Sequence, residues 1–273
     1  MKPYVFGVVL VGLTLNGGGV HAGPVSHPLD DERRFEVGVE YDHVLGRELK
    51  TGGGATDNDT ERFQAIYAKG QYALHPLLNV YVRLGAGEME RRVEDAFLEN
   101  IGRRDLTFDS DWGFAWGAGL GGAISLPWGL KTGYDASYVK ADADIESVTH
   151  ADNVLAFSRA GTSVSGDLTW EEFQVALWVG RPFPLRYGTV GLVVDPYVGG
   201  KWSDLNFDVD GAQYTVTDAG FSQIVKFTQA SGNAESLGVV LGCRLLVNDR
   251  VSMKVEGRLV DDYAVAGSAS WRF

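Results

Sequence analysis

The stretch that decides the fold is Tyr263 to Phe273, YAVAGSASWRF, in which two kinds of side chain alternate. One set is apolar or small and would share one face: Tyr263, Val265, Gly267, Ala269, Trp271 and Phe273. The other set would share the opposite face: Ala264, Ala266, Ser268, Ser270 and Arg272. A period of two residues predicts a β-strand. An apolar face that ends in Trp-x-Phe is typical of a membrane strand, because its outer face meets lipid and its aromatic rings lie at the membrane–water boundary.

Residues 1–22 have the pattern of a secretory signal peptide. Lys2 supplies a positive charge, an apolar run extends from Tyr4 to Leu15, and Val20 and Ala22 are small residues at the positions that signal peptidase needs. The run is too short to cross a bilayer as a helix. We therefore expect residues 1–22 to be removed and residues 23–273 to form one domain.

The composition favours strands over membrane helices. Hydrophobic residues make up 45% of the chain, yet no stretch after the signal approaches the roughly 20 continuous apolar residues of a membrane helix. Glycine and aromatic residues are abundant, with 36 Gly, 7 Trp, 11 Tyr and 13 Phe. The single cysteine, Cys243, excludes an internal disulfide. A formal net charge of −12 makes nucleic acid an improbable partner, since binding a phosphate backbone requires basic side chains.

Segments of alternating hydrophobicity recur along the chain, and their connections are short and long in turn. The expected strands are residues 34–42, 62–74, 79–88, 112–124, 130–140, 170–180, 189–202, 234–247, 251–259 and 263–273. Short turns are expected at 75–78, 125–129, 181–188 and 248–250, and long polar loops at 43–61, 89–111, 141–169 and 203–233. Outer-membrane barrels have short periplasmic turns and long external loops. The chain is therefore predicted to be all-β, a transmembrane antiparallel up-and-down β-barrel of about ten strands, with eight or twelve as alternatives.

The two faces of each expected strand differ in polarity. In the strand at 251–259, Val251, Met253 and Val255 alternate with Ser252 and Lys254. A soluble barrel would put the apolar face inside, whereas a membrane barrel turns it outward. The signal peptide, the terminal aromatic strand and the loop pattern favour the membrane arrangement.

Together, the signal, the alternation of strands and loops, and the closing Ser270-Trp271-Arg272-Phe273 resemble the superfamily of small outer-membrane β-barrels. This superfamily includes opacity-type surface proteins and the membrane domain of OmpA-like proteins. The resemblance implies residence in the outer membrane of a Gram-negative bacterium. It also implies contact with lipid and lipopolysaccharide, and a terminal strand, Tyr263, Val265, Gly267, Ala269, Trp271 and Phe273, that the barrel-assembly machinery recognises.

Charged residues on the inward faces are the first candidates for function. With the apolar faces outward, the lumen would receive Glu36, Glu40, Arg83, Asp135, Glu172, Lys254, Glu256, Arg258 and Arg272. Mixed signs in a narrow barrel favour ion pairs that close it, because an isolated charge in a low-dielectric interior costs several kcal/mol. The alternative is a narrow channel for small solutes.

Two further patterns are candidate sites. Asp42-His43 lies near the expected last outer hairpin, which contains Asp261-Asp262. A His–Asp pair that faces two further carboxylates could activate water, as in the omptin proteases, which are also ten-stranded barrels. Neighbouring residues on a strand, however, point to opposite faces. Asn206-x-Asp208-x-Asp210-Gly211 resembles the start of a calcium loop, yet Thr217 stands where the closing Glu should be. No zinc spacing, nucleophile elbow or nucleotide-binding turn is present. We therefore expect no cofactor, metal site or catalytic residue. The expected protein is a non-enzymatic monomer whose long acidic loops serve a structural or surface-interaction role, with the extracellular ligand left open.

Overall fold

The structure, a computed structural model, describes residues 34–49, 59–98, 102–150, 162–218, 221–226, 232–260 and 262–273. The expected signal peptide lies outside the described residues. The strands are β1 (Phe35–Leu49), β2 (Asp59–His75), β3 (Leu78–Leu98), β4 (Gly102–Ser110), β5 (Gly113–Ser125), β6 (Lys131–His150), β7 (Thr162–Gly180), β8 (Phe183–Tyr187), β9 (Val190–Asp218), β10 (Phe221–Lys226), β11 (Gly232–Val247), β12 (Val251–Val260) and β13 (Asp262–Arg272). One short 3-10 helix, η1 (Pro127–Gly129), joins β5 to β6.

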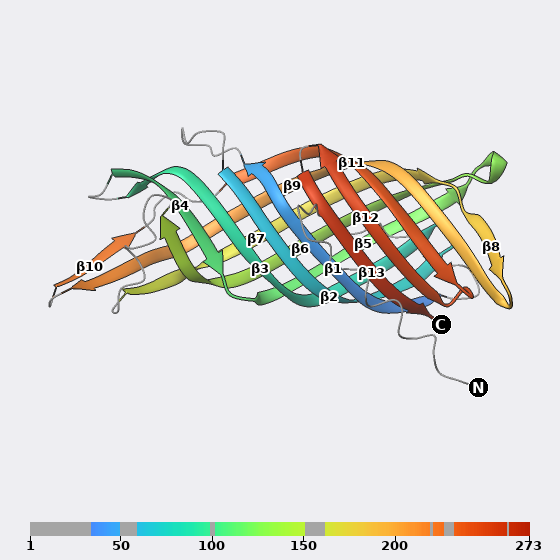
Figure 1. Ribbon diagram of the computed structural model, residues 1–273, viewed down its shortest axis with the longest axis horizontal. Helices are drawn as coiled ribbons and strands as arrows, with labels where there is room; N and C mark the ends of the chain where they lie inside the picture. The colour runs from blue at the N-terminus through green and yellow to red at the C-terminus, as the bar shows by residue number, and fades with distance from the viewer. Residues whose placement is uncertain are drawn as a thin grey trace.

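Ten of these strands close into a ring. Antiparallel pairing runs from β1 through β2, β3, β5, β6, β7, β9, β11, β12 and β13, and returns to β1. The strands are tilted relative to the long axis of the barrel, which carries β4 and β10 at one end and β8 at the other (Figure 1). The first of these is called the outer end and the second the turn end. The predicted antiparallel up-and-down barrel of about ten strands is confirmed.

The three remaining strands extend the ring. β4 pairs with β3 and β6 and so continues the line of β5, from which only Asp111 and Trp112 separate it. β8 continues the line of β7 in unchanged register, because Gly180 pairs with Tyr197 and Phe183 with Val194. β10 folds back on the outer part of β9.

Side chains on the outside of the ring form an apolar belt. On β12 the exposed Val255 and Leu259 alternate with the buried Lys254, Glu256 and Arg258. The exposed belt includes Val37, Val39, Tyr41, Ile66, Tyr72, Val80, Val82, Leu84, Phe114, Leu120, Phe173, Leu177, Val179, Val198, Leu237, Val239, Leu241, Val255, Leu259, Val265 and Trp271. An apolar outside and a polar inside is the arrangement of a membrane barrel. Among the described residues, no helix is long and apolar enough to cross a membrane.

Towards the outer end the polarity reverses, and several segments expected to be loops are strands. β3, β6 and β9 continue to Leu98, His150 and Asp218, well past the expected strand ends at 88, 140 and 202. On β9, Leu205 and Phe207 point inward and are fully buried, while Asp204, Asn206 and Asp208 point outward. The expectation of loops was wrong here because a strand surrounded by water carries its apolar face inside and polar residues outside. Such a segment contains many polar residues and therefore resembles a loop in sequence, although its apolar and polar residues still alternate.

The inner face of β5 carries no large side chain, and this lets its neighbours fill the lumen. A Cβ at Gly117 would contact Arg83, and one at Gly119 would collide with the ring of Tyr81. Both side chains come from β3, which pairs with β5. Glycine at these two positions therefore allows long side chains to lie across the inner wall.

Candidate functional site

The structure places all nine expected lumen charges on the inner wall of the ring. Eight are buried: Glu40, Arg83, Asp135, Glu172, Lys254, Glu256, Arg258 and Arg272. Glu36 is partly exposed, near the turn end, and accepts a hydrogen bond of 2.7 Å from Arg272 Nε. The other seven charges are distributed over three groups along the lumen.

The first group joins β1, β2 and β3. Glu40 is paired with Lys69 at 2.9 Å and with Arg83 at 2.6 Å, and Arg83 Nη1 also lies 3.5 Å from Asp42 Oδ2. The ring of Tyr81 packs under Lys69, with 4.3 Å between Nζ and the ring centroid. Two carboxylates face two cations in this group, so the buried charges largely offset each other.

The second group crosses the full width of the barrel. Glu172 on β7 accepts a hydrogen bond of 3.0 Å from Arg47 on β1, and it lies 4.0 Å from both Lys201 and Arg258. Arg47 also donates to Ser203 Oγ at 3.1 Å. β1 and β7 are five strands apart in either direction around the ring. The ion pair of Arg47 with Glu172 therefore connects opposite walls of the barrel.

The third group lies nearer the turn end. Tyr197 on β9 donates a hydrogen bond of 2.6 Å to Glu256 on β12, and Lys254 Nζ lies 3.7 Å from the same carboxylate. Arg244 donates to Ser252 Oγ at 3.2 Å. Tyr81 reaches from β3 to Asp135 on β6, with 3.1 Å between its hydroxyl and Oδ1. The two tyrosine hydrogen bonds each skip one strand, so they hold together walls that do not pair directly.

An apolar layer closes the lumen towards the outer end. Trp170 on β7 stacks on Phe63 of β2, with ring centroids 4.9 Å apart, and meets Phe207 of β9 edge to face at 6.0 Å. Trp170 and Phe207 are fully buried and belong to one cluster of buried apolar side chains from several strands. Arg91 reaches over the ring of Phe207 and donates to its carbonyl oxygen at 3.4 Å. The lumen of the described barrel is therefore filled by a charged layer and an apolar layer in sequence.

Sequence reasoning missed several members of these layers. The unexpected buried charges are Asp42, Arg47, Arg91, Asp195, Lys201 and Arg244. Arg47 and Arg91 lie within stretches expected to be loops. Lys201 and Arg244 lie inside expected strands on the inward parity, so the same alternation that located Glu172 carried the signal for them.

The structure does not assemble the Asp42-His43 pair that was compared with the omptin proteases. Asp42 is buried in the lumen beside Arg83, whereas the ring of His43 lies on the other face near Tyr41, with 3.3 Å between Nδ1 and the tyrosine hydroxyl. Asp261 and the side chain of Asp262 lie outside the described residues. The two members of the pair point to opposite sides of β1, as adjacent strand residues do.

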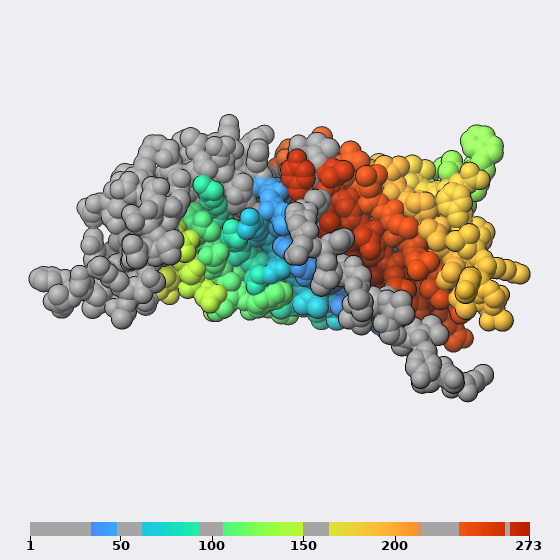
Figure 2. Space-filling view, in the orientation of Figure 1, coloured from blue at the N-terminus to red at the C-terminus, as the bar shows by residue number. Residues whose placement is uncertain are grey.

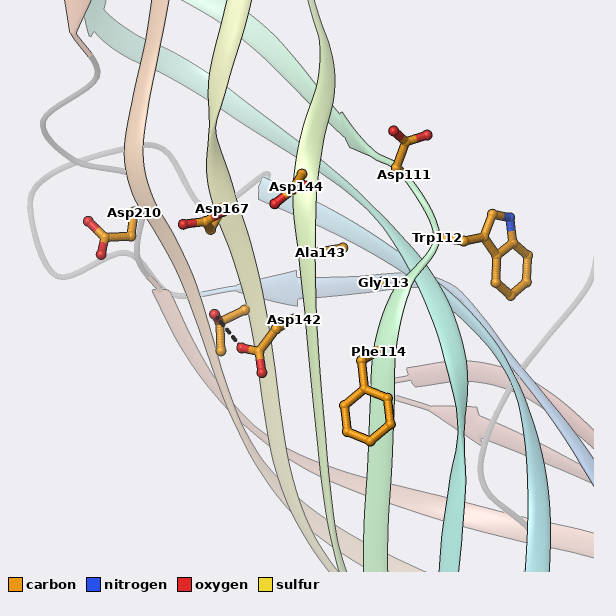
Figure 3. Close-up of a pocket in the computed structure, with 10 residues that line it drawn as sticks. Asp111, Trp112, Gly113, Phe114, Asp142, Ala143, Asp144, Asp167 and Asp210 are labelled. Carbon is orange, nitrogen blue, oxygen red and sulfur yellow. Dashed lines mark hydrogen bonds between the residues drawn. The ribbon is translucent and has the colours of Figure 1, made fainter.

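A hollow of about 510 Å³ lies on the outside of the barrel wall, beside the two residues that separate β4 from β5. Asp144, Asp167 and Asp210 project beside it from β6, β7 and β9, and Trp112 points away from them (Figure 3). Partial burial raises the pKa of Asp167 above its usual value, and its hydrogen bond with Asp144 and the negative charge of Asp210 act in the same direction. In the described part of the chain, no group of three or more His, Cys, Asp or Glu is arranged to hold a metal ion.

The stretch compared with a calcium loop is part of a strand. Asn206, Asp208 and Asp210 lie on β9, and Asn206 Nδ2 donates to Asp208 Oδ2 at 2.9 Å. Gly211 follows them with a φ of 60°, a conformation that favours glycine. The side chain of Thr217 lies outside the described residues.

Comparison with known proteins gives structural similarity only. No family model matches the chain, and no curated protein matches its sequence. The fold is similar to the transport unit of the autotransporter AIDA-I from Escherichia coli, with 8% identity, 89% of this chain and 91% of that chain covered, and a TM-score of 0.41. It is also similar to the translocator domain of the autotransporter NalP from Neisseria meningitidis, with 11% identity, coverage of 96% and 90%, and a TM-score of 0.40. The outer membrane transporter YddB from Escherichia coli matches at 11% identity, coverage of 87% and 32%, and a TM-score of 0.28.

Proposed function

We propose that this protein is a non-enzymatic outer-membrane barrel with a closed lumen, which presents the extended strands of its outer end at the cell surface. The observation that carries the proposal is the filled interior, in which Arg47 and Glu172 bridge opposite walls and Trp170 stacks on Phe63 beyond them. A barrel of about ten strands leaves little free bore, and side chains occupy it here.

The exterior supports placement in an outer membrane. Only helices and closed barrels satisfy their backbone hydrogen bonds inside lipid, and the ring is closed by the pairing of β1 with β13. A closed ring also leaves no unpaired strand edge within the apolar belt, which favours a monomer. The short turns then face the periplasm and the outer end faces the exterior, in contact with lipopolysaccharide.

The outer end has the character of a rigid surface element. β6, β7 and β9 continue beyond the apolar belt, where their outward residues are mostly polar or acidic and their inward residues form the buried apolar cluster. Such a segment needs no lipid to stay folded. We infer that its acidic outer surface, together with the loops that connect its strands, serves surface interaction or envelope integrity.

Labelling of single cysteines on intact cells tests this placement. In a Cys243→Ala background, Glu146→Cys on β6 should react with a membrane-impermeant maleimide, since Glu146 is exposed at the outer end. Arg250→Cys, in the turn between β11 and β12, is the matched control and should react only after the outer membrane is permeabilised. The reverse pattern would mean the opposite orientation, and labelling of both sites only after permeabilisation would contradict surface presentation.

The two alternatives find less support. A channel for small solutes needs a continuous polar path, but ion pairs cross the lumen and the apolar layer lies beyond them. A surface hydrolase needs converging His and carboxylate groups, and Asp42 and His43 point to opposite faces.

The terminal strand is proposed to be the part that the barrel-assembly machinery recognises. Its outward residues Tyr263, Val265 and Trp271 are exposed on the belt, and the backbone NH of Phe273 donates to the carbonyl oxygen of Phe35 at 2.9 Å. The ring of Phe273 also packs against that of Phe35, with centroids 6.1 Å apart.

Deleting Phe273 should reduce assembly in cells far more than it reduces stability. The deletion removes one hydrogen bond and one exposed ring contact, and even a fully buried Phe contributes only about 1.5–3 kcal/mol. Outer-membrane yield in cells should therefore fall, while refolding of the purified chain in detergent should stay nearly unchanged. Normal assembly of the shortened chain in cells would refute the recognition of this residue.

A further inference from the structure

The β8–β9 hairpin extends beyond its neighbours at the turn end. β6 begins at Lys131, which pairs with Gly180, so β8 has no partner on that side among the described residues. On the other side, β11 ends at Val247, which pairs with Leu192. The amber atoms of this hairpin protrude at the right-hand end of Figure 2.

Hydrogen bonds to a neighbouring turn fix the position of the hairpin, and its strand register fixes which side chains share a face. Asn248 of the neighbouring turn exchanges two hydrogen bonds with Gly191 on β9: its side-chain oxygen accepts from the backbone NH at 2.9 Å, and its own NH donates to the carbonyl at 2.8 Å. Gly188 closes the hairpin with a φ of 61°, as its tight turn requires. The register of β7 and β9 carries through without a shift.

The outward face of the hairpin is apolar and continues the belt. By the alternation that places Leu177 and Val179 outward, Phe183, Leu185 and Tyr187 share the same face, opposite Val194, Leu192 and Val190. Arg181 lies over the ring of Phe183, at 5.6 Å, as expected for two residues on one face. Leu185 is 52% exposed and Tyr187 82% exposed, so nothing in the described chain covers this face.

Several features indicate that lipid, and not an added peptide strand, covers the apolar outward face of β8. The free edge of β8 includes Pro184, which has no NH to offer to an incoming strand, and Pro182 precedes the strand. The apolar face is also continuous with a surface that already meets lipid. η1 lies beside the hairpin, because β6 follows it and pairs with the end of β7, and its Trp128 is 85% exposed. Aromatic side chains gather at the membrane–water boundary.

The dimensions and charges place the hairpin in the headgroup layer. Its five β8 residues rise about 3.3 Å each, and a strand tilt of about 40° converts this to a depth of about 12 Å. The headgroup layer on each side of a bilayer is about 5–7 Å thick, so the hairpin spans it. Unpaired backbone groups of β8 can be hydrated there, which the hydrocarbon core does not allow. Arg181, on the same outward face as Phe183, adds positive charge that complements anionic phosphates.

We propose that the β8–β9 hairpin, with Trp128, anchors this side of the barrel in the phospholipid headgroups of the periplasmic leaflet. The inference rests on the proposed membrane placement. It assigns the outward face of β8 to phospholipid and the opposite face, which carries Arg186, to water.

Spin labels at three sites test the inference in vesicles of phosphatidylethanolamine and phosphatidylglycerol. In the Cys243→Ala background, nitroxides are attached at Leu185→Cys on the outward face, Arg186→Cys on the opposite face and Leu177→Cys within the belt. Collision with lipid-soluble oxygen and with a water-soluble nickel chelate is measured at each site. All three side chains are exposed in the native protein, and a gel assay of heat-modifiable mobility confirms that the variants are folded.

The ratio of oxygen to nickel collisions at site 185 should lie below that at site 177, which is in hydrocarbon, and exceed that at site 186 several-fold. A site 185 that is as open to nickel as site 186, while site 177 stays shielded, would overturn the hairpin anchor and leave the membrane placement intact. A site 177 open to nickel would overturn the membrane placement itself.

Discussion

Replacing Glu172 by alanine is expected to lower the free energy of unfolding of the barrel by about 3–5 kcal/mol, the range for removing one partner of a buried charge group. Glu172 is buried, and Arg47, Lys201 and Arg258 share its carboxylate at 3.0, 4.0 and 4.0 Å. Loss of the carboxylate leaves a strong excess of positive charge in the centre of the lumen. The change is measured by urea titration of the barrel folded into vesicles.

The adjacent residue provides a matched control. Glu171 points outward and pairs with Lys140 at 2.9 Å in a partly exposed position. Glu171→Ala should lower the free energy of unfolding by only about 0–1 kcal/mol, as is usual for exposed ion pairs. Equal losses from the two substitutions would mean that the ion pairs of the lumen do not hold the walls together.

Leu241→Arg should destabilise the barrel folded into a bilayer by about 2–4 kcal/mol, the loss found for arginine near the membrane midplane. Leu241 lies on the outward face of β11 at the middle of its belt segment, between Leu237 and Leu245, and is 46% exposed. The new side chain would have to hold a guanidinium group in hydrocarbon. The same vesicle titration measures the loss.

Leu237→Arg, on the same face of β11, tests whether depth is the cause. Leu237 is more exposed, at 66%, and the next outward residue towards the outer end is Glu235. Arginine near the interface should cost only about 0–1 kcal/mol. A larger loss at 237 than at 241 would place the hydrocarbon region elsewhere on the barrel.

The alternation of side chains was sufficient to predict the ring. Every strand of the ring overlaps an expected one, and the inward parity located Glu40, Glu172 and Lys254 on the lumen wall. The parity also placed the apolar set outward. Strand pairing between sequence neighbours then left few other topologies.

The outer end could not be predicted in the same way, because the rule that relates polarity to the inside of the barrel changes along each strand. Leu205 is buried on the inner face while Leu241 is exposed on the outer face, and no local signal marks the level at which the polarity reverses. The sequence also could not predict which charged side chains pair with each other inside the lumen. Arg47 and Glu172 are 125 residues apart, and only closure of the ring brings them together.

Ion flux through the wild-type barrel tests the central claim most directly. The purified chain is folded into vesicles, insertion is verified by flotation and by heat-modifiable mobility, and conductance is recorded after fusion with a planar bilayer. The closed lumen predicts no current above that of protein-free bilayers, because Trp170 and Phe63 stack across it and the pair of Arg47 and Glu172 bridges its walls. Discrete and reproducible conductance steps from inserted barrels would contradict the account and favour the narrow channel.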